Sequence, residues 1–342
     1  MTTTTFKTIF SGHLEFGNSR TYEQVVQMFE HRSEAYYRSD IAFKIDEIFD
    51  ESTLAISIPR LITQSTEKSW RNTINLLEYI SQFAVAGDLS AWVAESGKVL
   101  KHSHIEPDSD KVAVQSYLKG RQLIKESGKE TEAKAALSRA IEKFERHALA
   151  YERRGHVNFL LKNYEDAMYD FSKCIDINPR NEDAYLGRAF VHIFNKNFEQ
   201  AIPDLGHTIK QSIPLQPIYW KARRVKAECH IKLEQWADAV KELKFYTRKQ
   251  FQEENPNWKW HKKAYYDYGI ALIGTKAYKE AIEAFNEALE APEGSGTVQA
   301  SDIYLQRGIA LKEGGKDGFV KDWKTAADKG SKKAVELLAE VS

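Results

Sequence analysis

An aromatic residue followed three positions later by alanine recurs at nearly fixed spacing through the C-terminal two thirds of this 342-residue chain. Counted from Ala133, which ends a weaker copy without the aromatic, successive alanines lie 34, 34, 38 and 42 residues apart. Such a period is typical of stacked two-helix units. The pattern therefore predicts a helical repeat array that works as a surface. The complete copies are Tyr164–Ala167, Phe198–Ala201, Trp236–Ala239 and Tyr278–Ala281.

The best repeat covers residues 148–181, with Tyr151, Gly155, Tyr164, Ala167 and Pro179 at informative positions. These residues resemble the tetratricopeptide repeat (TPR) family, whose modules are helix-turn-helix units of about 34 residues. The resemblance spans about residues 113–330 and implies an all-α solenoid of about six repeats. It also implies that small residues such as Gly155 and Ala167 lie where the two helices of a unit touch. The units are expected at 113–147, 148–181, 182–215, 220–250, 262–293 and 301–330.

The end of the array departs from this pattern. In the last unit Gly318 and Val320 stand where an aromatic helix start is expected. Residues 331–342 carry apolar side chains at helical spacing and are predicted to form a capping helix that shields the terminal repeat.

Residues 1–110 differ in pattern and are predicted to form a separate domain of no recognised family, followed by the solenoid over 111–342. Strands are expected at 6–16, 41–45, 54–58, 89–93 and 99–105, with Pro59 ending the third. Helices are expected from Thr21, with a capping box to Gln24, and over 66–83. Two helices must bury their apolar faces against one sheet. The order predicts an α+β domain resembling a ferredoxin-like βαββαβ unit with one extra strand.

Composition narrows the classes of function. Lys+Arg and Asp+Glu both number 49, and this balance argues against a nucleic-acid or membrane-surface protein. Residues 1–110 carry 10 basic and 16 acidic side chains. Since the totals are equal, the rest of the chain has a matching excess of basic side chains. Two cysteines form no disulfide framework, and the N-terminus lacks the pattern of a signal peptide. We therefore expect a cytoplasmic protein without a membrane partner.

Chemical motifs are absent from the sequence. Neither Gly-Lys pair, at 128–129 and 315–316, has the glycine spacing of a phosphate loop. His102, His104 and Glu106 share one face of a predicted strand, which could hold a metal but is more typical of polar surface. Exposed aromatics such as Phe10 or Phe16 could bind RNA on such a sheet, yet the domain is acidic. We expect no enzyme, metal or cofactor, although an active site in the first domain stays open.

The TPR resemblance implies that the first helix of each unit lines a concave groove. Carried over by position, the partner-binding residues are Glu152, Arg153, His156, Phe190, Phe194, Lys221, Arg224, Glu228 and Tyr266. Some family members grip a C-terminal carboxylate with basic residues and asparagines at these places. Here acidic residues intervene and the asparagines are missing, so the aromatic positions favour an apolar peptide or helix. Trp258 and Trp260 either anchor a partner or pack on a neighbouring repeat.

The sequence thus predicts a non-enzymatic protein-protein interaction scaffold that binds a peptide or helix in the concave TPR groove. One alternative places a ligand sensor or enzyme in residues 1–110, with the repeats recruiting partners. Another is intramolecular, with the acidic first domain occupying the groove.

Overall fold

The computed structural model describes residues 4–294, 296 and 298–341. The chain divides into two compact units, with the boundary between Val191 and His192. Unit 1 holds the sheet domain and the first helices of the array, and unit 2 holds the later helices. Each unit is described by itself. The predicted domain boundary at residue 110 stays a prediction.

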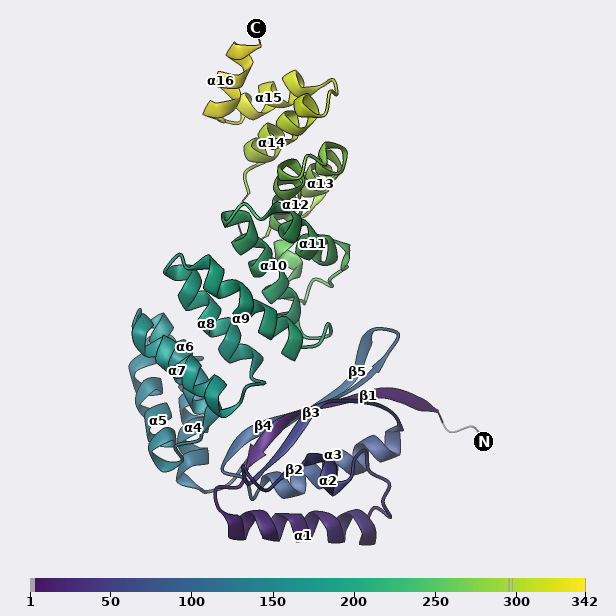
Figure 1. Cartoon of the computed structure of the whole chain (residues 1–342), viewed down its shortest axis with the longest axis vertical. Coiled ribbons are helices and arrows are strands. Elements are labelled where there is room, and N and C mark those ends of the chain that lie inside the picture. The colour runs from purple at the N-terminus through teal and green to yellow at the C-terminus, as the bar shows by residue number, and fades with distance from the viewer. Residues whose placement is uncertain (1–3, 295, 297, 342) are drawn as a thin grey trace. The chain divides into compact units, whose positions relative to one another are not determined.

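A five-stranded antiparallel sheet, in the order β2-β3-β1-β4-β5, forms the N-terminal part of unit 1 (Figure 1). Its core lies between the sheet and the two long helices, where Phe29 of α1 and Leu77 of α3 pack with Leu14 and Ile56 of the strands. The predicted fold, βαββαβ with one extra strand, is confirmed. The elements are β1 (Thr5–Glu15), α1 (Ser19–Ala35), α2 (Ile45–Ile48), β2 (Phe49–Asp50), β3 (Ala55–Thr66), α3 (Glu67–Ser81), β4 (Ala86–Glu95) and β5 (Lys98–Ile105).

The second strand was predicted in the wrong place. Residues 41–44 form no strand, and β2 follows only at Phe49–Asp50. The backbone N–H of Ala42 donates to Oγ1 of Thr73 at 2.9 Å, so this segment is held by α3 and not by a neighbouring strand. Phe43 still points into the core, with its ring 5.4 Å from that of Phe10, which explains the apolar alternation.

Two boundaries also differ from the sequence prediction. Helix α1 begins at Ser19, because the side chain of Asn18 caps it by accepting from the Thr21 N–H at 2.9 Å. Strand β3 does not end at Pro59. The register pairs Gly12 with Ile58 and then Phe10 with Leu61, so Pro59 lies in a bulge, where a strand tolerates proline.

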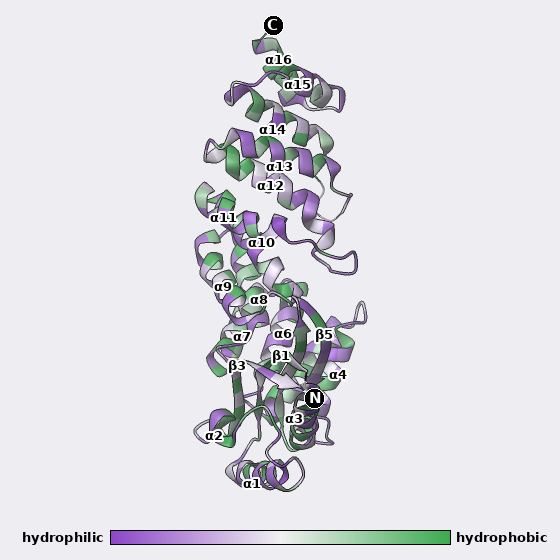
Figure 2. Cartoon of the chain, turned by 90° about the vertical axis from the view of Figure 1, so that its right-hand side faces the viewer, coloured by the Kyte–Doolittle hydropathy of each residue, from purple (hydrophilic) through white to green (hydrophobic). Residues whose placement is uncertain are grey.

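The rest of the chain is a series of helix pairs, which confirms the predicted repeats and the terminal helix. Figure 2 shows hydrophilic and hydrophobic residues mixed along the helices of this part that it labels, as amphipathic helices require. The first helices of the six pairs are α4 (Val112–Leu123), α6 (Ala148–Leu160), α8 (Glu182–Phe194), α10 (Pro217–Lys232), α12 (His261–Gly274) and α14 (Ala300–Glu313). The second helices are α5 (Glu130–Lys143), α7 (Tyr164–Ile177), α9 (Phe198–Gln211), α11 (Trp236–Arg248), α13 (Tyr278–Glu290) and α15 (Phe319–Asp328), and α16 (Lys332–Glu340) follows.

Small residues hold the helices of a pair close together. The alanines of the signature are fully buried. A Cβ added to Gly155 would lie 3.0 Å from the ring of Phe171, and one added to Gly269 would lie 2.5 Å from the ring of Phe285. In these two pairs the large aromatic of the second helix therefore fills the space that a glycine on the first helix leaves open.

The sixth repeat keeps more of the signature than the sequence suggested. Helix α15 begins at Phe319, which supplies the aromatic residue. Asp322 then takes the place of the alanine. It is only 5% exposed, and its two carboxylate oxygens each accept a hydrogen bond from the guanidinium of Arg307 at 2.7 Å. The buried charge is thus paired.

Within the described part of the chain, no helix combines the length and the apolar character needed to span a membrane.

Candidate functional site

The first helices of neighbouring repeats lie side by side: α4 with α6 in unit 1, and α10 with α12 and α12 with α14 in unit 2. We call the surface that these helices form the first-helix face. It is where the sequence predicts the partner-binding residues. The two units present this face in different ways.

In unit 1 the sheet domain packs against the first-helix face, with β4 in contact with α6 (Figure 1). Polar contacts tie the two together. Nε of Arg146 lies 3.2 Å from a carboxylate oxygen of Glu15, and the Arg180 guanidinium donates to Oγ of Ser57 at 2.8 Å. Nζ of Lys111 donates to the carbonyl of Ala84 at 3.1 Å. This part of the face is therefore a contact within the chain.

Two of the predicted partner-binding residues, Glu152 and Arg153, belong to that contact. Glu152 is 4% exposed, and its Oε2 lies 3.0 Å from Nε of Arg153. Burial raises the pKa of Glu152 to about 7; Arg153 opposes this shift, and Asp183 and Asp88 add to it. His156, on the next turn of α6, is exposed. Of the acidic side chains that intervene in the sequence, Glu152 is thus buried beside Arg153, whereas Asp183 is exposed.

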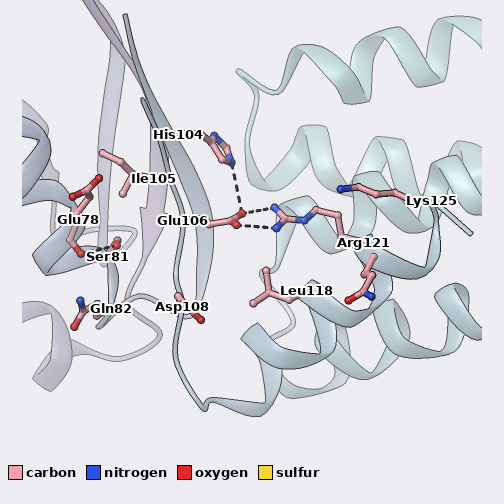
Figure 3. Close-up of a pocket in the computed structure, with 11 residues that line it drawn as sticks. Glu78, Ser81, Gln82, His104, Ile105, Glu106, Asp108, Leu118, Arg121 and Lys125 are labelled. Carbon is pink, nitrogen blue, oxygen red and sulfur yellow. Dashed lines mark hydrogen bonds and ion pairs between the residues drawn. The ribbon is translucent and has the colours of Figure 1, made fainter. Parts of the chain in front are cut away.

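The charged residues continue across the sheet as a chain of pairs (Figure 3). The Arg121 guanidinium of α4 donates two hydrogen bonds to the carboxylate of Glu106, one of them at 2.8 Å. Nε2 of His104 lies 3.6 Å from Glu106, and its Nδ1 lies 3.7 Å from Asp88. His104, followed by the hydrogen-bonded Arg121, lowers the pKa of Glu106 to about 2, against the effect of its partial burial. The pKa of His104 is raised, chiefly by Glu106.

This arrangement does not gather the metal ligands that the sequence left open. His102 stacks on Trp92, with ring centroids 5.1 Å apart, while Glu106 is bound by Arg121. Among the residues that the structure describes, no three His, Cys, Asp or Glu side chains are placed to hold a metal ion.

A pocket of about 670 Å³ opens beside Glu106, between α3, the end of β5 and α4 (Figure 3). Acidic Glu78 and Asp108 line it on the side of the sheet domain. Arg121 of α4 and Lys125, just after the end of α4, line it on the other side, with Ile105 and Leu118 between them. No local pattern in the sequence indicated this pocket, because its walls come from three separate segments, residues 78–82, 104–108 and 118–125.

In unit 2 the charges of the first-helix face pair within the face itself. Arg224 is 4% exposed, forms an ion pair with Glu228 four residues on, and lies 3.8 Å above the ring of Trp260. Lys263 pairs with Asp267 in the same spacing. Burial raises the pKa of Asp267 to about 6, although Lys263 opposes this. Opposite charges four residues apart on predicted helices were a sequence signal that could have found Lys263 and Asp267.

The aromatic positions are more accessible. Tyr266 is half-buried, with its ring 6.0 Å from that of Phe285, and burial raises its pKa to about 12. Phe190 and Phe194 lie four residues apart on α8 and so share one side of that helix. Phe190 is half-buried, whereas Phe194 is 55% exposed. Lys221 is exposed at the start of α10.

The predicted residues thus form separate groups. The structure brings Glu152 together with Arg153, and Arg224 with Glu228. It also adds Trp260, which the sequence offered either as a partner anchor or as packing: its indole packs with the cluster around Tyr246 and at the same time supports Arg224.

Comparisons with known proteins agree with these helix pairs. Residues 148–181 and 232–296 match the tetratricopeptide repeat family. Among solved structures, YrrB, described as a TPR protein with an unusual peptide-binding site, is similar with a TM-score of 0.51 and 18% identity over 60% of this chain and 98% of that one. PilF of Pseudomonas aeruginosa is similar with a TM-score of 0.50 and 17% identity over 68% and 98%. At these identities the likeness is one of fold. No curated protein matches the sequence.

Proposed function

Because this chain carries tetratricopeptide repeats, which mediate contacts between proteins, we propose that it is a non-enzymatic scaffold whose first-helix face binds a segment of a partner protein. The observation that carries the proposal is the face of unit 2, where Arg224 of α10 lies over the ring of Trp260 in the turn before α12, and Tyr266 stands on α12 itself. Aromatic and arginine side chains are the residues that most often anchor protein interfaces.

The pairing of charges on this face indicates which kind of side chain the partner would place on it. Arg224 and Lys263 already have carboxylate partners, so a peptide carboxylate would have to displace Glu228 or Asp267. An apolar side chain needs no such exchange, and it can cover Phe194, which is 55% exposed. We therefore propose an extended or helical segment with apolar anchors as the ligand. The fold relative YrrB is described as having a peptide-binding site, which is compatible with this choice.

Zero net charge favours a protein over a nucleic acid or an anionic membrane as the partner. A cytoplasmic location remains part of the proposal.

Capture of partners by the full-length chain from a lysate of its source organism tests this function, with two matched variants. Phe194→Ala removes an exposed phenylalanine from a first helix, and Phe245→Ala removes one that is 53% exposed from the second helix α11. A specific partner should be lost or weakened at least tenfold by Phe194→Ala and retained by Phe245→Ala. Equal capture by both variants would place the binding surface elsewhere.

The pocket beside Glu106 favours the alternative in which the first domain senses a ligand. Its acidic and basic walls suit a small molecule that carries both charges, such as a free amino acid. Thermal denaturation of the full chain with a panel of amino acids tests this. A ligand that binds there should raise the melting temperature of the Lys119→Ala control and not that of Lys125→Ala, because Lys125 lines the pocket and Lys119 does not. If no amino acid changed the melting temperature, the sensor alternative would be wrong.

A further inference from the structure

The two edges of the five-stranded sheet are protected to different degrees. An edge strand presents backbone N–H and C=O groups that can pair with another strand, so proteins cover such edges or place lysines, prolines or bulges on them. Figure 2 shows β3 and β5 on opposite sides of β1, in agreement with a strand order in which β5 forms one edge and the two-residue β2 the other. Most of the second edge therefore belongs to β3.

The β5 edge carries several of these protections. Lys98 and Lys101 are exposed on it, and its register with β4 leaves Leu100 in a bulge. Two copies of this strand paired with each other would bring their lysines close together, and like charges on paired strands are destabilising. The β5 edge is therefore a poor site for pairing between copies.

On the other edge the protection stops part of the way along β3. The strand β2 covers Ala55 and Ile56, the short helix α2 also contacts β3, and Pro59 lies in the bulge. Beyond the bulge, residues 61–66 contain no charge and no proline, and they are rich in the β-branched residues that strands favour. In the part of the chain that the structure describes, no strand pairs with these six residues on the side away from β1, and no loop backbone hydrogen-bonds to them. We call residues 61–66 the β3 edge segment.

The loop before α2 is attached elsewhere. The backbone N–H of Ala42 donates to Thr73 of α3, and the ring of Phe43 meets that of Phe10 in the core between the sheet and its helices. These contacts lie on the helix-covered side of the sheet and on α3. They do not use the backbone groups along the β3 edge segment.

The side chains of the segment also leave apolar surface exposed. Leu61 packs on the core, so its neighbour Ile62 points to the opposite face of the sheet. Ile62 is 51% exposed, and Gln64 on the same face is exposed as well. The edge therefore offers free backbone groups beside an exposed isoleucine, without a charge that would select a charged strand as its partner.

We propose that the β3 edge segment is a dimer interface, along which two copies of this chain pair antiparallel into one continuous sheet. The pairing is symmetric about a two-fold axis perpendicular to the sheet, the commonest symmetry of soluble oligomers. A second copy fits this edge because it supplies an equally uncharged strand, so that no like charges of the segment oppose each other. The proposal concerns the sheet and is independent of the partner on the first-helix face.

Symmetry restricts the register. A two-fold axis keeps the faces of both sheets aligned, so residues directly opposite each other must point to the same face. Centring the axis on Thr63 uses the segment best: Thr63 then lies opposite its own counterpart, and Ile62 lies opposite Gln64. Pairs of threonines are favourable neighbours across strands. The two Ile62 side chains become diagonal neighbours, close enough for each to cover part of the other.

Sedimentation velocity of the full chain, from micromolar to millimolar concentration, tests the dimer without any partner. The interface is short, so the dimer should form reversibly as the concentration rises. Ile62→Lys places two lysines next to each other across the axis and should weaken dimerisation about tenfold. Leu100→Lys is the matched control, because Leu100 is 49% exposed on the other edge of the sheet, and this variant should dimerise like the natural sequence.

Cross-linking tests the register. Directly opposite residues of antiparallel strands have Cα atoms about 4.5–5.5 Å apart, within the distance of about 4.4–6.8 Å that a disulfide spans. Thr63→Cys should therefore give a disulfide-linked dimer under mild oxidation, whereas Leu100→Cys should not. The natural Cys174 and Cys229 are buried, so they do not compete for the cross-link.

A single monomeric species at every concentration would overturn the proposal, and so would equal dimerisation of Ile62→Lys and Leu100→Lys. Circular dichroism checks that Ile62→Lys is folded; if it is not, the cross-linking yield of Thr63→Cys against that of Leu100→Cys decides. Equal yields from these two cysteine variants would contradict pairing through β3. None of these outcomes bears on the proposed scaffold function, because no partner is added.

Discussion

The first-helix face of unit 1 and that of unit 2 are built from the same repeat, but their charged side chains are paired in different ways. In unit 1, Glu152 is buried beside Arg153, and carboxylates of β4 and α8 add to the rise in its pKa. In unit 2, Arg224 and Lys263 each form an ion pair with a carboxylate four residues further along the same helix, without any contribution from a sheet. The repeat signature therefore fixes the scaffold of both faces, while residues outside it decide which face is open.

The largest expected effect tests whether the two units share one packing. Phe171 and Phe285 are fully buried at corresponding positions of α7 and α13, each against a glycine of a first helix. Phe171→Ala and Phe285→Ala should each destabilise the fold by about 3–5 kcal/mol. Urea denaturation followed by circular dichroism measures this. A small effect in one unit alone would mean that the repeats are not packed alike.

The next prediction concerns stability as a function of pH, which should fall over a different pH range for the buried acid of each unit. Raised carboxyl pKa values mean that the folded state binds protons more tightly, so stability falls as pH rises. For Glu152 the fall runs from about pH 4.5 to 7, and for Asp267 from about pH 3.8 to 6. Each can amount to up to about 3 kcal/mol. Glu152→Gln should remove the loss in the higher range, and Asp267→Asn that in the lower one.

Urea midpoints measured from pH 4 to pH 8 check these two windows. Asp166→Asn, at an exposed acid, serves as the control and should leave both windows unchanged. If both variants changed the same pH range, the two faces would not differ in their buried charges.

A smaller effect concerns the alanines of the signature. Ala167 and Ala281 have no exposed surface. Ala167→Leu and Ala281→Leu should each cost roughly 1–3 kcal/mol, because the added atoms force two close helices apart. Unchanged denaturation midpoints would show that the assigned register is wrong.

The smallest effect lies in the turns between the helices of a pair. Lys162 and Lys276 stand two residues before the aromatic of the signature, with φ of 62° and 61°. Glycine adopts this left-handed backbone without steric cost, so Lys162→Gly and Lys276→Gly should each stabilise the chain by up to about 1 kcal/mol. Lys173→Gly, inside helix α7, should instead destabilise it by about 1 kcal/mol. Loss of stability in the turn variants would contradict the turn geometry.

The sequence predicted well what repeats along the chain and less well what depends on distant neighbours. The helix pairs follow from the aromatic and alanine spacing, which is local. The segment at residues 41–45 has the alternation of a strand, but the hydrogen bond from Ala42 to Thr73, 31 residues away, holds it elsewhere. Pro59 is a strand terminator by local rules, yet a bulge opposite Ser11 accommodates it.

The same limit applies to the candidate site. The family register placed Glu152 and Arg224 on equivalent helices, and both do lie on first helices. Nothing local in the sequence indicated that Asp88 would help to raise the pKa of Glu152, because that influence depends on how the sheet domain packs. Trp260 was visible as an aromatic residue between repeats, but its place above Arg224 depends on the fold of residues 249–260.

Hydrogen exchange of the full chain, with and without the captured partner at pH 6, tests the central claim most directly. If the partner binds the open first-helix face, amides of α10 and α12 should gain protection while those of α6 stay unchanged beneath the sheet domain. Protection confined to the second helices α11 and α13, or to the sheet domain itself, would contradict a scaffold that binds through its first helices.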